Sequence, residues 1–503
     1  MVPTPVRPLD RSMARAVAWN AAARWLSQLL SWASTIAVAR LLTPYDYGLI
    51  GMGALYLELA MLISQAGIGD TIITLRDLTH QQIAELNTIS LILGVGLVGL
   101  SCALALPIAG FFSAPPLFAV LVASSGMFLF NAFQVVPRAL LQRELRFKLL
   151  ASIDTLRALF QIGVTLLFAF LKFRYWSLVI SYVCGSALAS SLTCYRRPHE
   201  FARPKLSHLR AELKYSFQVL LSRVAWYAYE NADFGVAGRV LGEVPLGNYT
   251  VAWTISSAPV EKITNLVTGV TPAYFSAVQG HRAELRRYLL RLTELLSFVT
   301  IPVSVGLALS ADSVVAVLLG PKWYGVIGPL RLLGVFVAAR SITTILPNLL
   351  TAIGDAGFVM WATVSFAIVM PIAFLVGSRW GTTGIAAAWV FACPVIVAPM
   401  YGRVFKKIEL PIREYLVTIL PAVNGSIVMI AVVLLVRSVV RPRSTSPLTL
   451  IFIVLLGILS YTGALFVFHR KRVFRLIQTI GKMLGKEPPD ASSANEAATG
   501  VVE

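Results

Sequence analysis

Apolar runs long enough to cross a lipid bilayer recur along this chain from Ala16 to His469, with only short interruptions. A helix that crosses the hydrocarbon core of about 30 Å needs roughly 20 mostly apolar residues. Hydrophobic residues make up 57% of the sequence, and charged residues only 13%. These proportions exclude a soluble enzyme, a disulfide-stapled secreted domain and a receptor with a single membrane anchor. The sequence therefore predicts an all-α polytopic membrane protein.

Hydropathy windows of about 19 residues predict about fourteen transmembrane spans. Their approximate ranges are 16–42, 47–66, 83–110, 117–140, 149–171, 175–195, 215–240, 246–275, 288–310, 326–352, 357–378, 381–402, 414–437 and 447–469. The first span is too long to be the apolar region of a secretory signal, and it contains Asn20 and Arg24. We therefore expect it to be a retained helix.

Basic residues are distributed unevenly among the predicted loops. Lys and Arg total 43 against 24 Asp and Glu, which gives a net charge of +19. In a soluble protein this excess would suggest a nucleic-acid partner, but here it indicates membrane topology. With the N-terminus in the cytoplasm, about 27 basic residues fall on the cytoplasmic side and about 9 on the other. We predict that both termini are cytoplasmic, as an even number of spans requires, and we expect no nucleic-acid partner.

The longest hydrophilic interruption separates six predicted spans from the next six. The predicted organisation is a cytoplasmic N-terminal tail (1–15), an N-lobe with spans one to six (16–195), a cytoplasmic interlobe linker (196–214), a C-lobe with spans seven to twelve (215–402), a cytoplasmic loop (403–413), two C-terminal spans (414–469) and a cytoplasmic tail that is basic and then disordered (470–503). The predicted fold is thus two pseudo-symmetric six-helix lobes plus two C-terminal helices around a central cavity.

A weak internal repeat relates the two predicted lobes. An offset of 199 residues places 39–42 on 238–241, Gly48 on Gly247 and Arg24 on Arg223. The repeat is parallel because six spans restore the orientation of the chain in the membrane. Two parallel lobes with a substrate site between them are a recurrent arrangement in transporters.

Polar side chains share one face of the first predicted span, where Asn20, Arg24 and Gln28 follow one another at intervals of one helical turn. The eighth predicted span carries a similar stripe, made of Thr250, Thr254, Ser257, Glu261, Asn265 and Thr268. Such a stripe is either a helix–helix seam held by hydrogen bonds or the wall of a water-filled cavity. Charge within a full-length stripe favours the cavity.

Two arginines are the main candidates for substrate binding. Arg24 and Arg223 each lie about 12 Å from the predicted cytoplasmic end of their span, at 1.5 Å per residue. Facing guanidinium groups repel each other unless an anion joins them, and their planar fork suits phosphate. We hypothesise a pyrophosphate clamp that is reached from the cytoplasm. The alternative is that acidic residues neutralise the arginines, and the same residues are candidates for ion coupling or charge balance: Glu58, Glu230, Asp233 and Glu261.

No pattern typical of a metal, disulfide or nucleotide site is visible. The 4 cysteines lie in apolar spans without a CxxC motif, and the 5 histidines lie in loops or at span ends. A GxxxxGK[ST] motif for ATP is also absent from the sequence. We expect no cofactor. Asp154 and Arg157, three residues apart on the fifth predicted span, are expected to form an internal ion pair.

Three stretches carry a resemblance to a known family. They are ARLLTPYDYGLIGM from Ala39 to Met52, GIGDTIITLRDLT from Gly67 to Thr79 and LLGPKWYGVIGPLRLL from Leu318 to Leu333. The chain resembles, over essentially its whole length, the Wzx-type polysaccharide flippases of the multidrug/oligosaccharidyl-lipid/polysaccharide (MOP) exporter superfamily. These motifs are loose and are more specific for the family than for a substrate.

The resemblance implies a fourteen-helix, two-lobed protein in the bacterial inner membrane. Such a protein moves an undecaprenyl-pyrophosphate-linked oligosaccharide from the cytoplasmic to the periplasmic leaflet by alternating access, for exopolysaccharide or lipopolysaccharide synthesis. The cationic cavity residues of these relatives match Arg24, Arg223, Lys262 and Arg340 here, with Asn20 and Gln28 beside Arg24. The last two spans would form a lipid-facing groove for the prenyl tail, and the implied partners are membrane lipids, a polysaccharide polymerase and chain-length machinery.

Other functions stay open at this point. A cation-coupled multidrug exporter of the same superfamily would need an acidic cavity, which the four acidic candidates could supply. A membrane polysaccharide polymerase or ligase would also have many spans, but the short exterior loops and their lack of histidine or clustered carboxylates argue against it. A scaffold protein would not need aligned charges inside its spans, because burying them is costly.

Overall fold

The structure is a computed structural model that describes residues 33–65, 68–75, 77–204, 220, 224, 226–228, 230–269, 271–440 and 446–483. Within these residues the regular secondary structure is entirely helical. Ten helical segments of the described chain are long and apolar enough to cross a membrane, and one of them, Ala356–Lys407, contains two predicted spans. The predicted all-α membrane fold is therefore confirmed. The count of about fourteen spans stays a prediction, because most of 16–42 and part of 215–240 lie outside the described residues and 246–275 is not among the ten segments.

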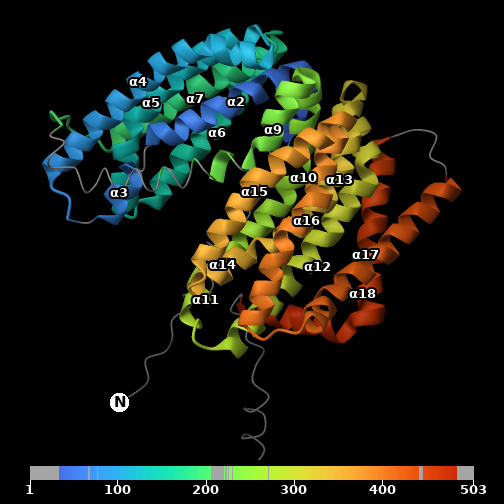
Figure 1. Cartoon of the computed structure of the whole chain (residues 1–503). Helices are drawn as coiled ribbons and strands as arrows, with labels where there is room; N and C mark the ends of the chain where they lie inside the picture. Colours follow the sequence, from blue (N-terminus) through green and yellow to red (C-terminus); the bar gives the residue numbers. More distant parts are fainter. Residues whose placement is uncertain are drawn as a thin grey trace, which may run out of the picture. The chain divides into compact units, whose positions relative to one another are not determined.

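The described chain divides into two compact units. Unit 1 contains the residues up to Trp253 together with Leu318–Pro329 and Ser365–Ala388. Its helices are α2 (Pro44–Gln65), α3 (Ile68–Thr74), α4 (His80–Phe112), α5 (Pro116–Arg143), α6 (Phe147–Phe170), α7 (Trp176–Arg196), α9 (Ala232–Val236), η1 (Ala237–Leu241), the first part of α10 (Glu243–Thr268) and η3 (Pro321–Val326). Figure 1 shows α4, α5, α6 and α7 side by side, and α5 packs against all three of the others and α2.

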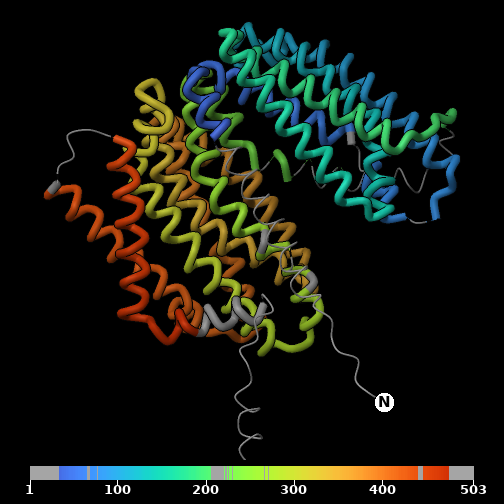
Figure 2. Tube along the Cα trace, turned by 180° about the vertical axis from the view of Figure 1, so that it is seen from behind, coloured from blue at the N-terminus to red at the C-terminus, as the bar shows by residue number. Residues whose placement is uncertain are grey.

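Unit 2 contains Thr254–Val317, Leu330–Val364 and the residues from Trp389 onward. Its helices are α11 (Thr271–Ala277), α12 (Arg282–Val314), α14 (Ile345–Ala352), α17 (Ile412–Val440) and α18 (Pro447–Met483). Four further helices, η2 (Val315–Leu319), α13 (Ile327–Thr343), α15 (Ala356–Gly377) and α16 (Gly381–Lys407), are divided between the two units, and η4 (Ser378–Trp380) belongs to unit 1. The orange-red tubes of α17 and α18 lie side by side in Figure 2, and both pack against α12.

Most predicted spans coincide with helices. The stretch after the second span, which lies outside the predicted spans, contains the short helix α3. The eighth span, predicted to run to about residue 275, comprises α10, which ends at Thr268, and α11, which follows it. The last span is predicted to end at about His469, where the backbone is non-helical (φ −132°, ψ 29°), and helix continues beyond this residue to Met483.

The short helix α3 exists because it completes the apolar core of the first bundle. Ile68 and Ile72 lie one turn apart, and both are fully buried against Leu86 of α4 and Val136 of α5. Helix α4 begins at a capping box in which Thr79 accepts a hydrogen bond from the Gln82 backbone N–H and the Gln82 side chain accepts one in return. The cap fixes where the loop after α3 ends.

The start of α2 is organised by the buried carboxylate of Asp46, which is 1% exposed. It accepts hydrogen bonds from the Thr43 backbone N–H at 2.9 Å and the Thr43 hydroxyl at 2.6 Å. It also accepts one from the Tyr175 backbone N–H at 3.2 Å, and the Arg174 guanidinium lies 3.5 Å away. Pro44 occupies the first helical position, where its missing N–H costs nothing. The motif TPYD is thus a helix start that also anchors the loop before α7.

In unit 2, Asp355 ties the loop before α15 to the end of α16. Its carboxylate accepts a hydrogen bond from Arg403 Nε at 2.7 Å, and Lys407 Nζ lies 3.8 Å away. The hydrogen bond from Arg403 lowers the pKa of the Asp355 carboxyl below its usual value. The contact therefore stabilises the folded state at neutral pH and is lost as the pH falls through that lowered pKa.

We expect Asp46→Ala to lower the free energy of unfolding by about 2 kcal/mol or more, because it removes the cap of α2 and leaves buried donors without an acceptor. Thermal unfolding of the purified protein in detergent measures the loss. Asp77→Ala, at an exposed position of the same unit, is the control and should leave the unfolding temperature unchanged. Equal unfolding temperatures for both variants would contradict the role of Asp46.

Candidate functional site

Four predicted substrate-binding residues, Asn20, Arg24, Gln28 and Arg223, lie outside the described residues. The pyrophosphate clamp between Arg24 and Arg223 therefore stays a prediction. The structure places the six other predicted residues in two groups: Glu58, Glu230 and Asp233 belong to unit 1, and Glu261, Lys262 and Arg340 belong to unit 2.

Glu58 lies on α2 beside aromatic residues of the predicted seventh span. It lines a cavity of about 420 Å³ together with Trp226 and Tyr227, and its carboxyl group is a hydrogen-bond partner of the Tyr227 hydroxyl. The Tyr227 hydroxyl also lies 3.2 Å from the carbonyl oxygen of Leu55. Glu230 is half-buried one turn further along the chain. A carboxylate beside two aromatic rings can attract a cation or accept a proton.

Asp233 is completely buried, and its hydrogen bonds explain how a carboxylate is tolerated there. One oxygen accepts from the Phe234 backbone N–H at 2.9 Å, and the other accepts from the Tyr249 hydroxyl at 2.7 Å. Tyr249 is itself fully buried on α10. These contacts fix α9 against α10, so Asp233 contributes to the packing of unit 1.

In unit 2, Glu261 and Lys262 are exposed on α10, and Arg340 is half-buried on α13. The predicted stripe of α10 does not have a single environment, because Ser257 is buried whereas Glu261 and Asn265 are exposed.

The expected ion pair between Asp154 and Arg157 was wrong in its partner. Asp154 instead forms a bidentate pair with Arg138 of the neighbouring helix α5, at 2.9 and 2.8 Å. A bidentate guanidinium–carboxylate pair is favoured over a contact three residues along one helix, because both oxygens are then satisfied in one plane.

The most constrained contact in unit 1 is a crossing of α2 and α10 at two glycines. A Cβ atom on Gly48 would overlap the carbonyl oxygen of Glu243, and a Cβ on Gly247 would overlap the carbonyl oxygen of Pro44. The Cβ on Gly247 would also lie 2.9 Å from the Gly48 backbone nitrogen. Only glycine lets two helix backbones approach this closely.

The residues of the crossing are related by the offset of 199 residues found in the sequence. Gly48 and Gly247 are 199 residues apart, and so are the residues that they touch, Pro44 and Glu243. Each glycine thus meets the first turn of the helix that carries its repeat-related counterpart. The match of Gly48 and Gly247 at this offset thus corresponds to a reciprocal contact between the second helices of the two predicted repeats.

A second set of contacts surrounds the crossing. Trp323, fully buried, donates from Nε1 to the Ala39 carbonyl oxygen at 2.9 Å, and Lys322 Nζ donates to the carbonyl oxygens of Arg40 and Leu42. Arg40 in turn donates from Nε to the Leu318 carbonyl oxygen at 2.7 Å. The segment before α2 is therefore fastened to the PKW segment of η3.

A related contact occurs at the repeat-related arginine, Arg239, whose Nη1 lies 3.4 Å from Ser113 Oγ at the end of α4. Sequence reasoning assigned no role to Arg40, Arg239, Lys322 or Trp323. The signal was present, because these residues lie in the quoted motifs or in the matched segments 39–42 and 238–241. These residues lie at or beyond the ends of the predicted spans, where a charge or a tryptophan is common and does not by itself indicate a contact.

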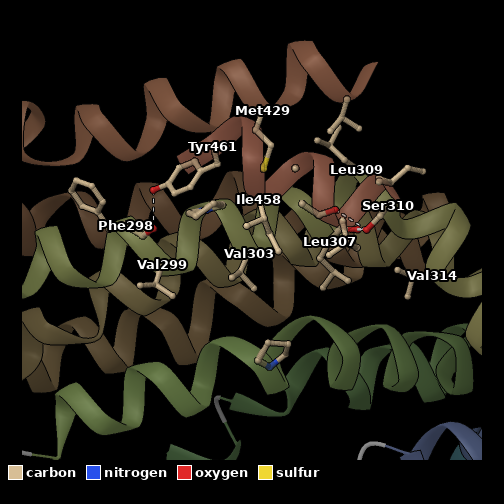
Figure 3. Close-up of a pocket in the computed structure, with 17 residues that line it drawn as sticks. Phe298, Val299, Val303, Leu307, Leu309, Ser310, Val314, Met429, Ile458 and Tyr461 are labelled. Atoms are coloured by element: carbon tan, nitrogen blue, oxygen red, sulfur yellow. Dashed lines mark hydrogen bonds between the residues drawn. The ribbon is translucent and has the colours of Figure 1, made fainter. Parts of the chain in front are cut away.

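An apolar groove of about 420 Å³ runs between α12, α17 and α18 in unit 2, with Pro259 of α10 also lining it (Figure 3). Figure 3 shows Val303 and Leu307 of α12 facing Met429 of α17 and Ile458 of α18. Tyr461 closes one end, where its hydroxyl donates to the Phe298 carbonyl oxygen at 2.8 Å. The other hydroxyl of the lining, Ser310 Oγ, donates to the Gly306 carbonyl oxygen at 2.7 Å, so the groove presents almost only hydrocarbon.

No group of three or more His, Cys, Asp or Glu side chains in the described part of the chain is arranged to hold a metal ion.

A family of proteins described as "Polysaccharide biosynthesis protein" matches residues 37–328, which is more than half of the chain. The chain belongs to this family. The matched region contains the glycine crossing and the contacts of Lys322 and Trp323, and it ends just after them. The resemblance to proteins of polysaccharide biosynthesis is thereby confirmed.

Relatives within the polysaccharide biosynthesis family are similar over long stretches. The lipopolysaccharide biosynthesis protein WzxC of Escherichia coli is 25% identical over 347 residues, which cover 66% of this chain and 68% of the relative. The succinoglycan biosynthesis transport protein ExoT of Rhizobium meliloti is 22% identical over 504 residues, which cover 97% of this chain and 98% of the relative.

Solved structures show the same fold. The lipid II flippase MurJ, in an inward closed conformation, matches 90% of this chain and 99% of its own length with a TM-score of 0.72 and 14% identity. An inward-facing multidrug transporter of the MATE family matches 76% of this chain and 94% of its own length with a TM-score of 0.61 and 16% identity. With ten helical segments of the described chain long and apolar enough to cross a membrane, the chain is a multi-pass membrane protein.

We expect Gly48→Val to force α2 and α10 apart, because an overpacked contact costs about 1–3 kcal/mol. The probe is a single cysteine, Leu246→Cys, in a background without the four native cysteines; Leu246 is fully buried beside Gly51 and Gly238. Labelling of this cysteine by a water-soluble maleimide should accelerate about tenfold, which corresponds to about 1.4 kcal/mol.

The matched control is Gly96→Val on α4, where an added Cβ meets no atom within 4 Å. It should leave the labelling rate unchanged. An unchanged rate in Gly48→Val as well would mean that the crossing tolerates a side chain and does not hold the helices together.

Proposed function

We propose that this chain translocates a polyprenyl-pyrophosphate-linked oligosaccharide repeat unit from the cytoplasmic to the periplasmic leaflet, for exopolysaccharide or lipopolysaccharide synthesis. The observation that carries the proposal is the match of residues 37–328 to the polysaccharide biosynthesis family. The names of WzxC and ExoT and the flippase fold of MurJ support it. The carrier is proposed to be undecaprenyl pyrophosphate, and the membrane the bacterial inner membrane with both termini in the cytoplasm.

A flippase must solve two solvation problems at once. The sugar and pyrophosphate need a hydrated path, because moving charge through hydrocarbon is costly, while the prenyl chain can stay in an apolar environment. We assign the polar path to Arg24, Arg223, Lys262 and Arg340, with Asn20 and Gln28 beside Arg24. The apolar groove of α12, α17 and α18 suits the prenyl chain, since its lining offers dispersion contacts and almost no polar atoms.

Alternating access requires that one end of the path closes while the other opens. The crossing of Gly48 and Gly247, reinforced by Lys322 and Trp323, is a closed contact of this kind. The distribution of basic residues assigns this end to the periplasmic side. We therefore propose that transport requires this crossing to open on the periplasmic side. A polysaccharide polymerase and chain-length machinery would receive the translocated units.

Leaflet-resolved quantification of lipid-linked repeat units tests the function in cells depleted of the protein. We expect the units to accumulate on the cytoplasmic leaflet, and wild type to restore their transfer. Arg24→Ala combined with Arg223→Ala should fail to restore it, because pyrophosphate loses both guanidinium partners. Normal transfer in depleted cells, with no second flippase present, would reject the function. Rescue by the double variant would reject only the clamp.

A cation-coupled multidrug exporter is the second candidate, and the cavity lined by Glu58, Trp226 and Tyr227 favours it. Aromatic faces and a carboxylate suit an organic cation. Glu58→Gln discriminates the two functions, because it should abolish drug resistance if cations are the substrate. It should leave the binding of lipid-linked sugar intact if Glu58 acts only in coupling or charge balance.

Filling the apolar groove should slow the translocation of substrates with a long prenyl chain. Gly457→Phe places a ring beside Met429, whose sulfur lies 3.6 Å from the position of an added Cβ. We expect about a tenfold loss for a long-chain substrate and little change for a short prenyl analogue, since about 0.8 kcal/mol is lost per methylene that is no longer buried. Reconstituted vesicles and a leaflet-specific probe measure both rates.

The matched control is Gly463→Phe on the exposed face of the same helix, where an added Cβ meets no atom within 4 Å. It should leave both rates unchanged. Equal slowing of the long and the short substrate by Gly457→Phe would show that the groove does not hold the tail.

A further inference from the structure

A second cavity, of about 400 Å³, lies inside the first bundle between α3, α5 and α6. Its size is in the range of small-molecule sites. Unlike the groove of unit 2, it is lined by polar side chains; those that matter here are Asp70, Asn131, Gln134, Arg138, Asp154 and Arg157. None of them belongs to the predicted site or to the contacts around the glycine crossing.

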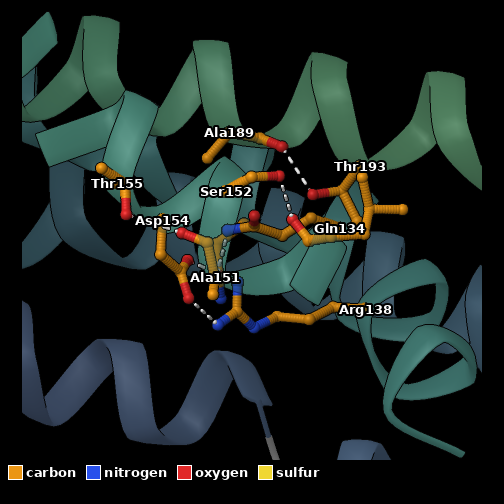
Figure 4. A network of polar contacts seen from close by, with 10 residues as sticks. Gln134, Arg138, Ala151, Ser152, Asp154, Thr155, Ala189 and Thr193 are labelled. Atoms are coloured by element: carbon orange, nitrogen blue, oxygen red, sulfur yellow. Dashed lines mark hydrogen bonds and ion pairs between the residues drawn. The ribbon is translucent and has the colours of Figure 1, made fainter. Parts of the chain in front are cut away.

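Three polar side chains of this cavity lie on one face of α5. Asn131, Gln134 and Arg138 follow one another at intervals of three and four residues, so they share one stripe of α5. Asp154 faces Arg138 from α6, and Figure 4 shows their ion pair beside Gln134. A polar stripe in the middle of a transmembrane bundle is expensive unless polar groups or water occupy the space beside it.

Two amide side chains on this stripe have unused hydrogen-bonding capacity. Asn131 and Gln134 are only 7% and 5% exposed, and the Gln134 Nε2 donates to Asn131 Oδ1 at 2.9 Å. The remaining atoms, Asn131 Nδ2 and Gln134 Oε1, have no protein partner among the described residues. If both amides are flipped, the pair still leaves one donor and one acceptor. A buried amide group without a partner costs about 1–3 kcal/mol, so a ligand that bonds to both would be stabilised.

The charged groups of the cavity balance one another. Arg138 and Asp154 form the bidentate pair, and Arg157 and Asp70 add one charge of each sign. Arg157 makes a long hydrogen bond of 3.5 Å from Nη2 to Ser186 Oγ, which uses one of its five donors. A cavity with equal opposite charges and both amide donors and acceptors favours a neutral ligand whose groups can donate and accept at once. Hydroxyl groups have this property.

We propose that this cavity is a sugar-binding subsite that takes one neutral, polyhydroxylated ring. The inference rests on the proposed flippase function, which supplies a carbohydrate as substrate. Arg138 lies five residues from the end of α5, or about 8 Å at 1.5 Å per residue. The basic-residue distribution assigns that end to the cytoplasm. The subsite is therefore reached from the side on which the proposed substrate is loaded.

Binding of free sugars to the full chain in lipid nanodiscs tests the subsite. The probes are glucose, galactose and N-acetylglucosamine, compared with glucuronate and inorganic phosphate, and saturation-transfer NMR detects binding in the millimolar range. We expect at least one neutral sugar to bind and Asn131→Leu to weaken it about tenfold, which corresponds to about 1.4 kcal/mol. Gln134→Met, which preserves the side-chain volume, should weaken sugar binding by a similar factor.

Asn87→Leu is the matched control. Asn87 is a buried asparagine of the same unit that also has one unpartnered side-chain atom, Oδ1, but it does not line the cavity. It should leave sugar binding unchanged. Thermal unfolding of each variant distinguishes a loss of sugar binding from a loss of folding. If Asn131→Leu does not fold, the effect of Gln134→Met on sugar binding tests the subsite.

Three results would overturn the subsite. They are no binding of any neutral sugar, tighter binding of phosphate or glucuronate than of the sugars, and equal weakening by Asn87→Leu. Because the assay needs no translocation, the subsite and the flippase function can fail separately. Sugar binding without leaflet transfer would retain the subsite and reject the function, whereas transfer without sugar binding would do the reverse.

Discussion

The crossing of α2 and α10 at Gly48 and Gly247 constrains unit 1 closely, because it brings two helix backbones together with no side chain between them. Each glycine meets a carbonyl oxygen in the first turn of the opposite helix. Those first turns must therefore be fixed in place. On α2 this is done by Pro44 and the buried carboxylate of Asp46, which also holds the loop before α7. On α10 the chain enters through Gly242, whose φ of +86° is accessible to glycine.

This contact explains the residues of two family motifs. TPYDYG contains the helix start and the crossing glycine of α2, and GPKW contains the residues that hold the preceding segment. Gly320 has a φ of +94°, so it lets the chain turn directly into the PKW segment. The motifs thus describe a close contact between helix backbones and the hydrogen bonds that hold it. This agrees with their poor specificity for substrate, since a packing contact need not touch the substrate.

The fold was predictable from the sequence because lipid leaves few alternatives. Backbone groups in hydrocarbon must be bonded within the segment, so each long apolar run had to be a helix. The same reasoning failed at α3, where Ile68 and Ile72 make a short helix that depends on burial against Leu86, a contact distant in sequence. It also failed for Asp154, because a helix periodicity shows which residues share a face but not which neighbouring helix supplies Arg138.

The site was less predictable than the fold, and the reason is the physical meaning of a charge inside a span. The sequence shows that such a charge must be compensated, but it does not show by what. Asp233 illustrates this, since a phenol and a backbone N–H solvate its carboxylate in the core of unit 1. The two amides beside the Arg138–Asp154 pair illustrate the converse, because Asn131 and Gln134 carry no charge and attract no attention in the sequence. In a lipid-solvated bundle, an amide that lacks a partner beside a cavity can be satisfied by a ligand, just as a charge can be compensated by its neighbour.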